Sequence, residues 1–229
     1  VISCLSIIPK VSDILFVRTR KNVTHLIVSF FMEFFTILFY NIDVMYMKKR
    51  VLISYLSYSK LSLNTAYNLY DLLDKNKYDI HLLDISNYFN NKINIFNNYL
   101  FKDYKISLLN GLLYKVMNNK IISKQYYKYS IKCFDSTNLR NYFKKINPEL
   151  IICTHYSASY ISAYYNKSKL INSKILNFVT DYTMHESWTI NSKEIDKYIV
   201  QNDIVKNEFI KKGINPKDIY SYNINANLD

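Results

Sequence analysis

The sequence predicts an α/β fold, a Rossmann-like parallel sheet flanked by helices, on three observations. From Val51 onward, short apolar runs alternate with longer segments of helical periodicity, which is typical of βαβ units. Runs such as 175–180 (ILNFVT) are continuously apolar, like strands that a parallel sheet buries on both faces. Two of the runs end directly in polar side chains, so one edge of the sheet is expected to carry ligand-binding residues.

Six apolar runs have the length of strands, namely 51–56, 79–85, 149–154, 175–180, 197–200 and 219–222. Between the first two, Ala66, Leu69 and Leu73 recur at i, i+3 and i+7 and therefore share one face of a helix. Two more helices are expected, at 157–166 and 203–212. The second of these stops before Gly213, as helices commonly do.

A long helical region is expected from 100 to 130, and two rows of side chains recur in and just beyond it. The first row is apolar and consists of Leu109, Leu112, Leu113, Val116 and Met117. The second row repeats every four residues and consists of Lys120, Lys124, Lys128 and Lys132. An apolar face beside a lysine row is typical of a helix that lies on an anionic membrane. An ordinary domain helix with a solvated lysine row is the alternative.

The composition indicates a folded, basic protein. The chain has 229 residues, of which 49% are hydrophobic and 16% aromatic, so it can bury a core and is unlike a disordered chain. Its formal net charge of +12 favours an anionic partner, either nucleic acid or an acidic membrane surface. A/T-rich codons are another explanation for the abundant lysine. Because the basic residues are scattered and form no recognised motif, no nucleic-acid partner is expected.

The cysteines give no sign of a metal site or of a disulfide framework. Cys4, Cys133 and Cys153 form no CxxC pair and no Cys/His ligand spacing. Cys153 lies inside an apolar strand and is interpreted as a core residue. We therefore expect a reducing, cytoplasmic location, with no metal and no cofactor.

Residues 1–46 form an apolar N-terminal extension that differs from the rest of the chain. The stretch 26–46 is nearly long enough to span a bilayer, and basic residues precede it. Glu33 and Asp43 weaken the case for a membrane anchor, because burying a carboxylate in a bilayer is costly. Since Met47 stands just before the first strand, we interpret the extension as upstream sequence or a start-site artefact, with a membrane anchor as the alternative.

The segment 179–188 (VTDYTMHESW) is the most informative motif of the chain. Asp181 directly follows an apolar strand, and His185 and Trp188 come four and seven residues later. Asp181 either contacts a ligand, which is our interpretation, or caps the next helix. A nearby carboxylate favours the charged form of His185, while a position on a surface loop is the alternative. Trp188 is either a packing residue or a flat apolar wall for a ligand.

A second polar pair, Thr154 and His155, follows the strand run 150–153 (LIIC) in the same way. His155 either takes part in catalysis or caps the helix that follows. If the two strands are neighbours, His155, Asp181 and His185 share one cleft. Two imidazoles and a carboxylate are legitimate ligands for zinc or iron. Nothing in their spacing demands a metal, however, and none is expected.

These motifs resemble the amino-terminal domain of the monogalactosyldiacylglycerol synthase and processive diacylglycerol glucosyltransferase family. The resemblance rests on 179–188, on DKYIV at 196–200, on KKGINPKDI at 211–219 and on the Thr154–His155 pair after PELIIC. It implies that residues 47–229 are the acceptor lobe of a two-lobed (GT-B type) glycosyltransferase, with the nucleotide-sugar lobe absent from them.

The family moves a hexose from a UDP-sugar to the free hydroxyl of diacylglycerol, and the resemblance implies the same reaction here. A base takes the proton of the glyceride hydroxyl while the second lobe holds the departing UDP. Asp181, Trp188, Ser62 and Thr154 would line the acceptor side. The implied partners are diacylglycerol or a related lipid, an anionic membrane surface and a separate donor-binding lobe. The implied location is cytoplasmic, peripheral on the inner face of the plasma membrane.

The stretch 57–62 (SYSKLS) departs from the family pattern. After its first strand the family carries a glycine-rich turn that ends in a histidine, the base for the acceptor proton. Here Ser59 and Leu61 replace the glycines and Ser62 replaces the histidine. A serine hydroxyl cannot act as a general base near neutral pH, whereas an imidazole can.

Two imidazoles therefore remain as candidate bases, those of His155 and His185, with Asp181 as the supporting carboxylate. The alternative to an active enzyme is a truncated or degenerate lobe that at most binds lipid at a membrane surface.

Overall fold

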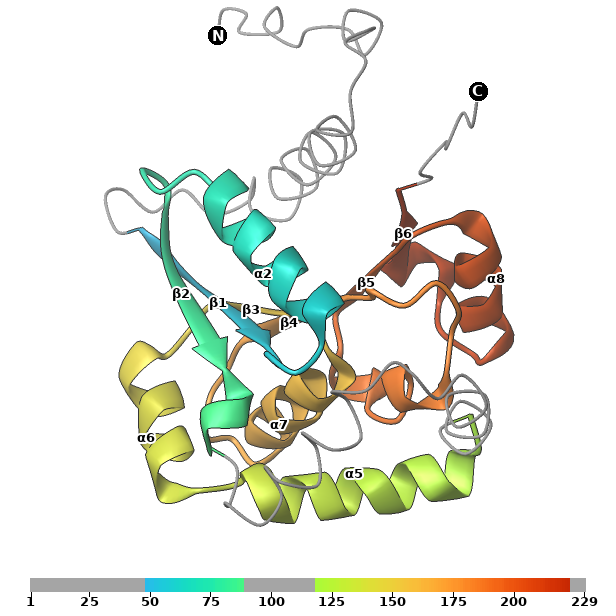
Figure 1. Cartoon of the computed structure of the whole chain (residues 1–229), viewed down its shortest axis with the longest axis horizontal. Coiled ribbons are helices and arrows are strands. Elements are labelled where there is room, and N and C mark those ends of the chain that lie inside the picture. The colour runs from blue at the N-terminus through green and yellow to red at the C-terminus, as the bar shows by residue number, and fades with distance from the viewer. Residues whose placement is uncertain (1–47, 89–117, 223–229) are drawn as a thin grey trace, which may run out of the picture.

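The computed structural model describes residues 48–88 and 118–222, which build a six-stranded parallel sheet with helices on both faces (Figure 1). The strands are β1 (Lys49–Tyr55), β2 (Tyr78–Asp84), β3 (Leu150–Cys153), β4 (Lys174–Phe178), β5 (Lys197–Val200) and β6 (Ile219–Ser221). Their order across the sheet is β2-β1-β3-β4-β5-β6, and every neighbouring pair is parallel. The predicted parallel α/β fold is confirmed, and all six expected strands are present.

The described α-helices are α2 (Lys60–Leu72), α5 (Lys120–Phe134), α6 (Thr137–Ile146), α7 (Tyr156–Lys167) and α8 (Asp203–Lys211). Short 3₁₀ helices lie at η2 (Ile85–Tyr88), η3 (Glu186–Trp188), η4 (Ser192–Glu194) and η5 (Pro216–Asp218). The helices expected at 157–166 and 203–212 are α7 and α8. Of the long helical region, only α5 and the turn before it are described.

Two expectations concern residues outside the described ranges. They are the apolar extension 1–46 and the apolar row 109–117. In the described part of the chain, no helix combines the length and the apolar character needed to cross a membrane.

The described helices begin where the sequence offers a polar cap. In each case the capping side chain accepts a hydrogen bond from a backbone N–H of the first turn, and the five caps are Ser59, Asn119, Ser136, His155 and Asn202. At its other end, α8 stops before Gly213, whose φ of +89° is a conformation that glycine adopts without strain. Local side-chain chemistry thus fixes where the helices start and where α8 stops.

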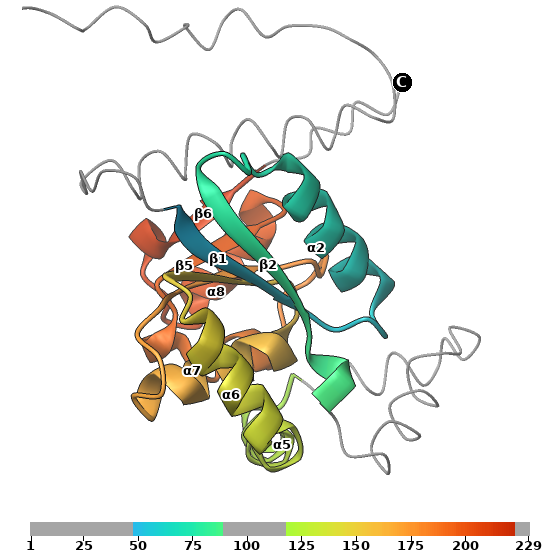
Figure 2. The same cartoon turned by 90° about the vertical axis from the view of Figure 1, so that its left-hand side faces the viewer.

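The sheet separates two apolar cores. On one face, Ile53 of β1 packs with Leu69 of α2. On the other face, Leu52 belongs to a larger core that includes Phe143 of α6 and Phe209 of α8. Figure 2 shows α2 on one side of the strands and α5, α6 and α7 on the other. The chain moves across the sheet in one direction from β1 to β2 and in the opposite direction from β3 to β6. Because each crossover between parallel strands is right-handed, this reversal puts α2 on one face of the sheet and the later helices on the other.

The reversal of direction places a topological switch point between β1 and β3. In open α/β sheets, ligands bind beyond the carboxyl ends of the strands at such a point. The segments that follow β1, β3, β4 and β5 all lie at this edge of the sheet, and we call them together the carboxyl edge: residues 56–62, 154–156, 179–188 and 201–204.

Candidate functional site

The carboxyl edge contains every residue that the sequence marked as a candidate. β3 and β4 are direct neighbours and run in the same direction, so the segments after them lie side by side. Thr154 and His155 come from the first segment, and Asp181 from the second. The juxtaposition that the sequence required is therefore present.

Hydrogen bonds between Ser62 and Thr154 connect the segments that follow β1 and β3, across the switch point. The backbone N–H of Leu56 donates to the Ser62 hydroxyl at 3.2 Å, and that hydroxyl lies 2.9 Å from the Thr154 hydroxyl. Thr154 in turn donates to the backbone carbonyl of Ser62 at 3.0 Å. Both residues are fully buried. Their hydroxyl groups are occupied inside the protein, so in this conformation they shape the edge rather than face an acceptor.

Asp181 is the central carboxylate of the site. Its Oδ2 accepts a hydrogen bond of 2.6 Å from the indole N–H of Trp188 and lies 3.1 Å from Nε2 of His185. Burial opposes its charged form. The hydrogen bonds from His185 and Trp188 outweigh that effect and hold the pKa of the Asp181 carboxyl below its ordinary value. Because its side chain is 36% exposed, Asp181 can also meet a ligand.

His185 and Trp188 face inward, toward Asp181 and the core. Nε2 of His185 is engaged by Asp181, and its Nδ1 is buried without a hydrogen-bond partner among the described residues. Neither nitrogen is therefore open to a substrate. Trp188 is 2% exposed, so its ring packs in the core and does not form the ligand wall that the sequence suggested. The two side chains position the Asp181 carboxylate.

His155 caps α7, which was one of the two readings of the sequence. Its Nδ1 accepts a hydrogen bond of 3.1 Å from the backbone N–H of Ser157. Burial lowers the pKa of His155 to about 4; the charge of Asp181 opposes this shift and His185 adds to it. The imidazole is therefore neutral near pH 7. Because Nδ1 accepts this hydrogen bond, the proton of the neutral ring lies on Nε2, which can donate a hydrogen bond to a ligand.

The ring of Tyr156 joins these groups into one cluster. Its centroid lies 4.1 Å from that of His155 and 5.1 Å from that of His185. Within residues 48–88 and 118–222, no three His, Cys, Asp or Glu side chains are arranged to hold a metal ion. The arrangement provides a fixed carboxylate and a neutral imidazole at one edge of the sheet, a pair suited to binding and deprotonating a hydroxyl group.

Three exposed apolar side chains at the carboxyl edge were not anticipated from the sequence. Leu61 and Ile204 lie in the first turns of α2 and α8 and are 44% and 74% exposed, and Tyr182, directly after Asp181, is 70% exposed. The sequence contained a signal for Leu61 and Ile204, because an apolar residue in the first turn of a helix that follows a parallel strand must lie at this edge. These side chains form an apolar rim, which we define as Leu61, Tyr182 and Ile204.

Comparison with known proteins identifies the family. The family model described as monogalactosyldiacylglycerol (MGDG) synthase matches residues 59–224, which include all the candidate residues. The chain belongs to the MGDG synthase family. The resemblance that the motifs suggested is thus confirmed, and the family is one of glycosyltransferases.

Two further similarities are more distant. The chain is 27% identical over 176 residues to the processive diacylglycerol beta-glucosyltransferase of Bacillus pumilus (strain SAFR-032). The matched region covers 75% of this chain and 44% of that protein. Among solved structures, the chain is similar to the apo form of the lipopolysaccharide outer core galactosyltransferase WaaB, with a TM-score of 0.42 and 14% sequence identity. The similar region covers 75% of this chain and 44% of the WaaB chain. The chain thus spans less than half the length of either protein.

Proposed function

We propose that this chain is the acceptor-binding lobe of a glycosyltransferase that moves a hexose from a UDP-sugar to diacylglycerol. Membership of the MGDG synthase family supports the class of reaction. The observation that carries the proposal is the pair formed at the carboxyl edge by the Asp181 carboxylate and the neutral imidazole of His155.

In the proposed reaction, this pair must both orient the acceptor hydroxyl and remove its proton. The Asp181 carboxylate accepts the hydrogen bond from the free hydroxyl of diacylglycerol and takes its proton, while the Nε2–H of His155 donates to the hydroxyl oxygen and orients it. The hydroxyl oxygen then forms a bond to the anomeric carbon as the bond from that carbon to UDP breaks, and a nucleotide-sugar lobe holds the departing UDP. Each of the two groups shifts the pKa of the other, which indicates that they are close enough to act on one hydroxyl group.

The apolar rim gives the acceptor a route from the membrane. Diacylglycerol keeps its two acyl chains in the bilayer, so a lobe that binds it must approach the lipid surface. Leu61, Tyr182 and Ile204 surround the edge where Asp181 lies and would enter the interface, while the net charge of +12 attracts anionic lipid. These features support the proposed peripheral position on the inner face of the plasma membrane.

Sedimentation with vesicles tests the proposal. Vesicles that contain diacylglycerol should bind the protein more tightly than matched vesicles without it. Ile204→Ser should weaken this binding. Ile121→Ser is the matched control, because Ile121 is similarly exposed, at 69% against 74%, but lies on α5. Equal binding to both vesicles would contradict acceptor binding, and a loss confined to Ile121→Ser would assign the membrane contact to α5.

A second candidate function is a lobe that binds lipid and catalyses nothing. The observation that favours it is Ser62, which occupies the family's histidine position and whose hydroxyl is held by Leu56 and Thr154. Transfer from a UDP-sugar to diacylglycerol, measured with a nucleotide-sugar lobe supplied, separates the two functions. Catalysis through Asp181 requires transfer by the wild type and its loss in Asp181→Asn with lipid binding retained. Absence of transfer by the wild type favours the non-catalytic lobe.

A further inference from the structure

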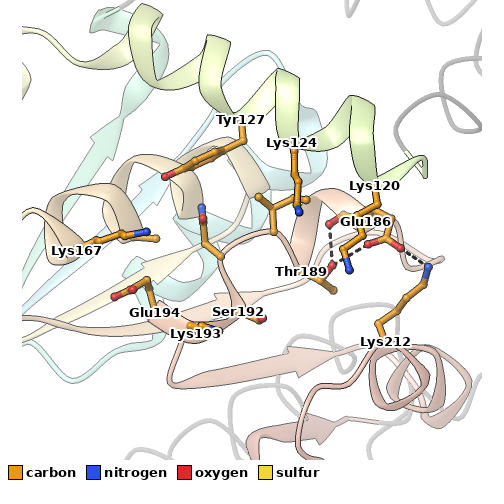
Figure 3. A pocket seen from close by; sticks show the side chains of 13 residues that line it. Lys120, Lys124, Tyr127, Lys167, Glu186, Thr189, Ser192, Lys193, Glu194 and Lys212 are labelled. Carbon is orange, nitrogen blue, oxygen red and sulfur yellow. Dashed lines mark hydrogen bonds and ion pairs between the residues drawn. The ribbon is translucent and has the colours of Figure 1, made fainter.

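A cavity of about 300 Å³ lies in the helix layer, apart from the Asp181 cluster (Figure 3). It opens between the first half of α5, the end of α7 and the segment 186–194. None of Asp181, His155 and His185 is among its lining residues. The cavity is therefore a separate place at which a ligand can bind.

Positive charge dominates this cavity. Five of its lining residues are lysines, namely Lys120, Lys124, Lys167, Lys193 and Lys212, against two glutamates, Glu186 and Glu194. Glu186 is already neutralised, because its buried carboxylate is paired with Lys212 and accepts a hydrogen bond from Thr189. The other four lysines form no ion pair with any described residue. These four lysines are exposed, so their ammonium groups are free to turn toward an anion that enters the cavity.

Neutral donors complete the lining. The amide nitrogen of Asn191 is buried beside the hydroxyl of Tyr127, and both side chains line the cavity. Lys120 and Lys124 project from α5 toward the segment that carries Thr189 and Ser192 (Figure 3). Ammonium groups on one wall and an amide on the other are the donors that a tetrahedral oxyanion requires.

We propose that this cavity binds a phosphate group, carried either by a small soluble phosphate ester or by a phospholipid headgroup. Lysine is a common phosphate ligand because it acts as a point charge with three donors. The volume is at the small end of ligand pockets, which range from about 300 to about 1,000 Å³, so it suits a phosphate with a few carbon atoms. The binding site is additional to the acceptor site proposed above.

The lysine row of α5 supplies a matched control. All four lysines of the row are exposed, but Lys120 and Lys124 line the cavity whereas Lys128 and Lys132 do not. The double variants Lys120→Gln/Lys124→Gln and Lys128→Gln/Lys132→Gln therefore remove equal charge from one helix. Only the first pair removes it from the cavity.

The test measures binding of the whole chain to two probes at low salt. Glycerol 3-phosphate is titrated calorimetrically, and vesicles of phosphatidylcholine with or without phosphatidic acid are used in sedimentation. For the probe that binds, we expect Lys120→Gln/Lys124→Gln to weaken the affinity about tenfold or more and Lys128→Gln/Lys132→Gln to change it less than about twofold.

The pattern across probes decides the outcome. Binding of glycerol 3-phosphate with the selective loss assigns a soluble ester. Binding only of phosphatidic acid vesicles with the same selective loss assigns a lipid headgroup. Equal losses in both double variants, or no binding of either probe, overturn the proposal. Failure of the acceptor proposal is seen separately, because it concerns the gain in binding that diacylglycerol gives to vesicles without phosphatidic acid.

Discussion

Asp181 links the fold of the carboxyl edge to its chemistry. The carboxylate that the acceptor would approach already receives the indole N–H of Trp188 on its Oδ2, which also faces the imidazole of His185. Both donors belong to nearly buried side chains, so the carboxylate is held by groups that cannot turn to water instead. Replacing Asp181 should therefore lower both the stability of the protein and its affinity for the acceptor.

Asp181→Ala should destabilise the protein by about 1–3 kcal/mol, because it leaves the buried indole N–H of Trp188 unpaired. Urea unfolding measures this loss, and Asp71→Ala, an exposed position on α2, is the control. Trp188→Phe removes the other partner of the same hydrogen bond. The loss in the double variant should therefore be smaller than the sum of the single losses, and strict additivity would show that the bond does not couple the two residues.

His155 should make stability depend on pH. Its pKa is about 4 in the folded protein, mainly through burial, and near its ordinary value of 6.5 when unfolded. Between these values the unfolded chain binds a proton that the folded chain does not, so stability falls as pH falls, by roughly 3 kcal/mol in total. Protonation would also turn Nδ1 from an acceptor into a donor facing the N–H of Ser157.

His155→Asn separates this effect from the loss of the helix cap, since asparagine is itself a good cap. Unfolding curves of the two proteins should diverge between about pH 7 and about pH 4, with the wild type losing more stability than the variant. Curves that stay parallel over this interval would mean that His155 is not protonated on unfolding.

At the scale of elements, the contact between the loop after β1 and the loop after β3 is the feature that departs from the family pattern. Ser62→Ala should cost about 1–2 kcal/mol, because the buried N–H of Leu56 loses its acceptor and Thr154 loses a partner. Asn64→Ala, exposed on the same helix, should cost little by comparison. Equal unfolding midpoints for Ser62→Ala and the wild type would contradict this role.

The helices and strands were predictable where local chemistry determines them. The strand Lys197–Val200 has the predicted ends, since its apolar run is bounded by polar residues on both sides. The start of α8 and its stop at Gly213 follow from local signals in the same way. The lysine row of α5 was predicted as one surface, yet tertiary packing divides it: half of the row turns toward α7 and lines the cavity. Periodicity cannot show what covers a helix face.

At the scale of the whole molecule, the sequence predicted a parallel sheet but not the order of its strands. Strand order depends on contacts between residues far apart in the chain, and the pairing of β1 with β3 joins segments separated by α2, β2, α5 and α6. That pairing creates the switch point and brings Ser62 to Thr154. Of the candidate site, the cluster of Asp181, His185 and Trp188 followed from local spacing, whereas the inward direction of Trp188 depends on the packing of the core.

The central claim is that the acceptor binds at the carboxyl edge. Photo-crosslinking with a diacylglycerol that carries a light-activated group on its glycerol end, followed by mapping of the labelled peptides, tests it most directly. We expect label in 56–62, 154–156 and 179–188, with competition by unlabelled diacylglycerol. Label confined to the opposite edge of the sheet, around 147–149 and 168–174, would contradict acceptor binding at the carboxyl edge.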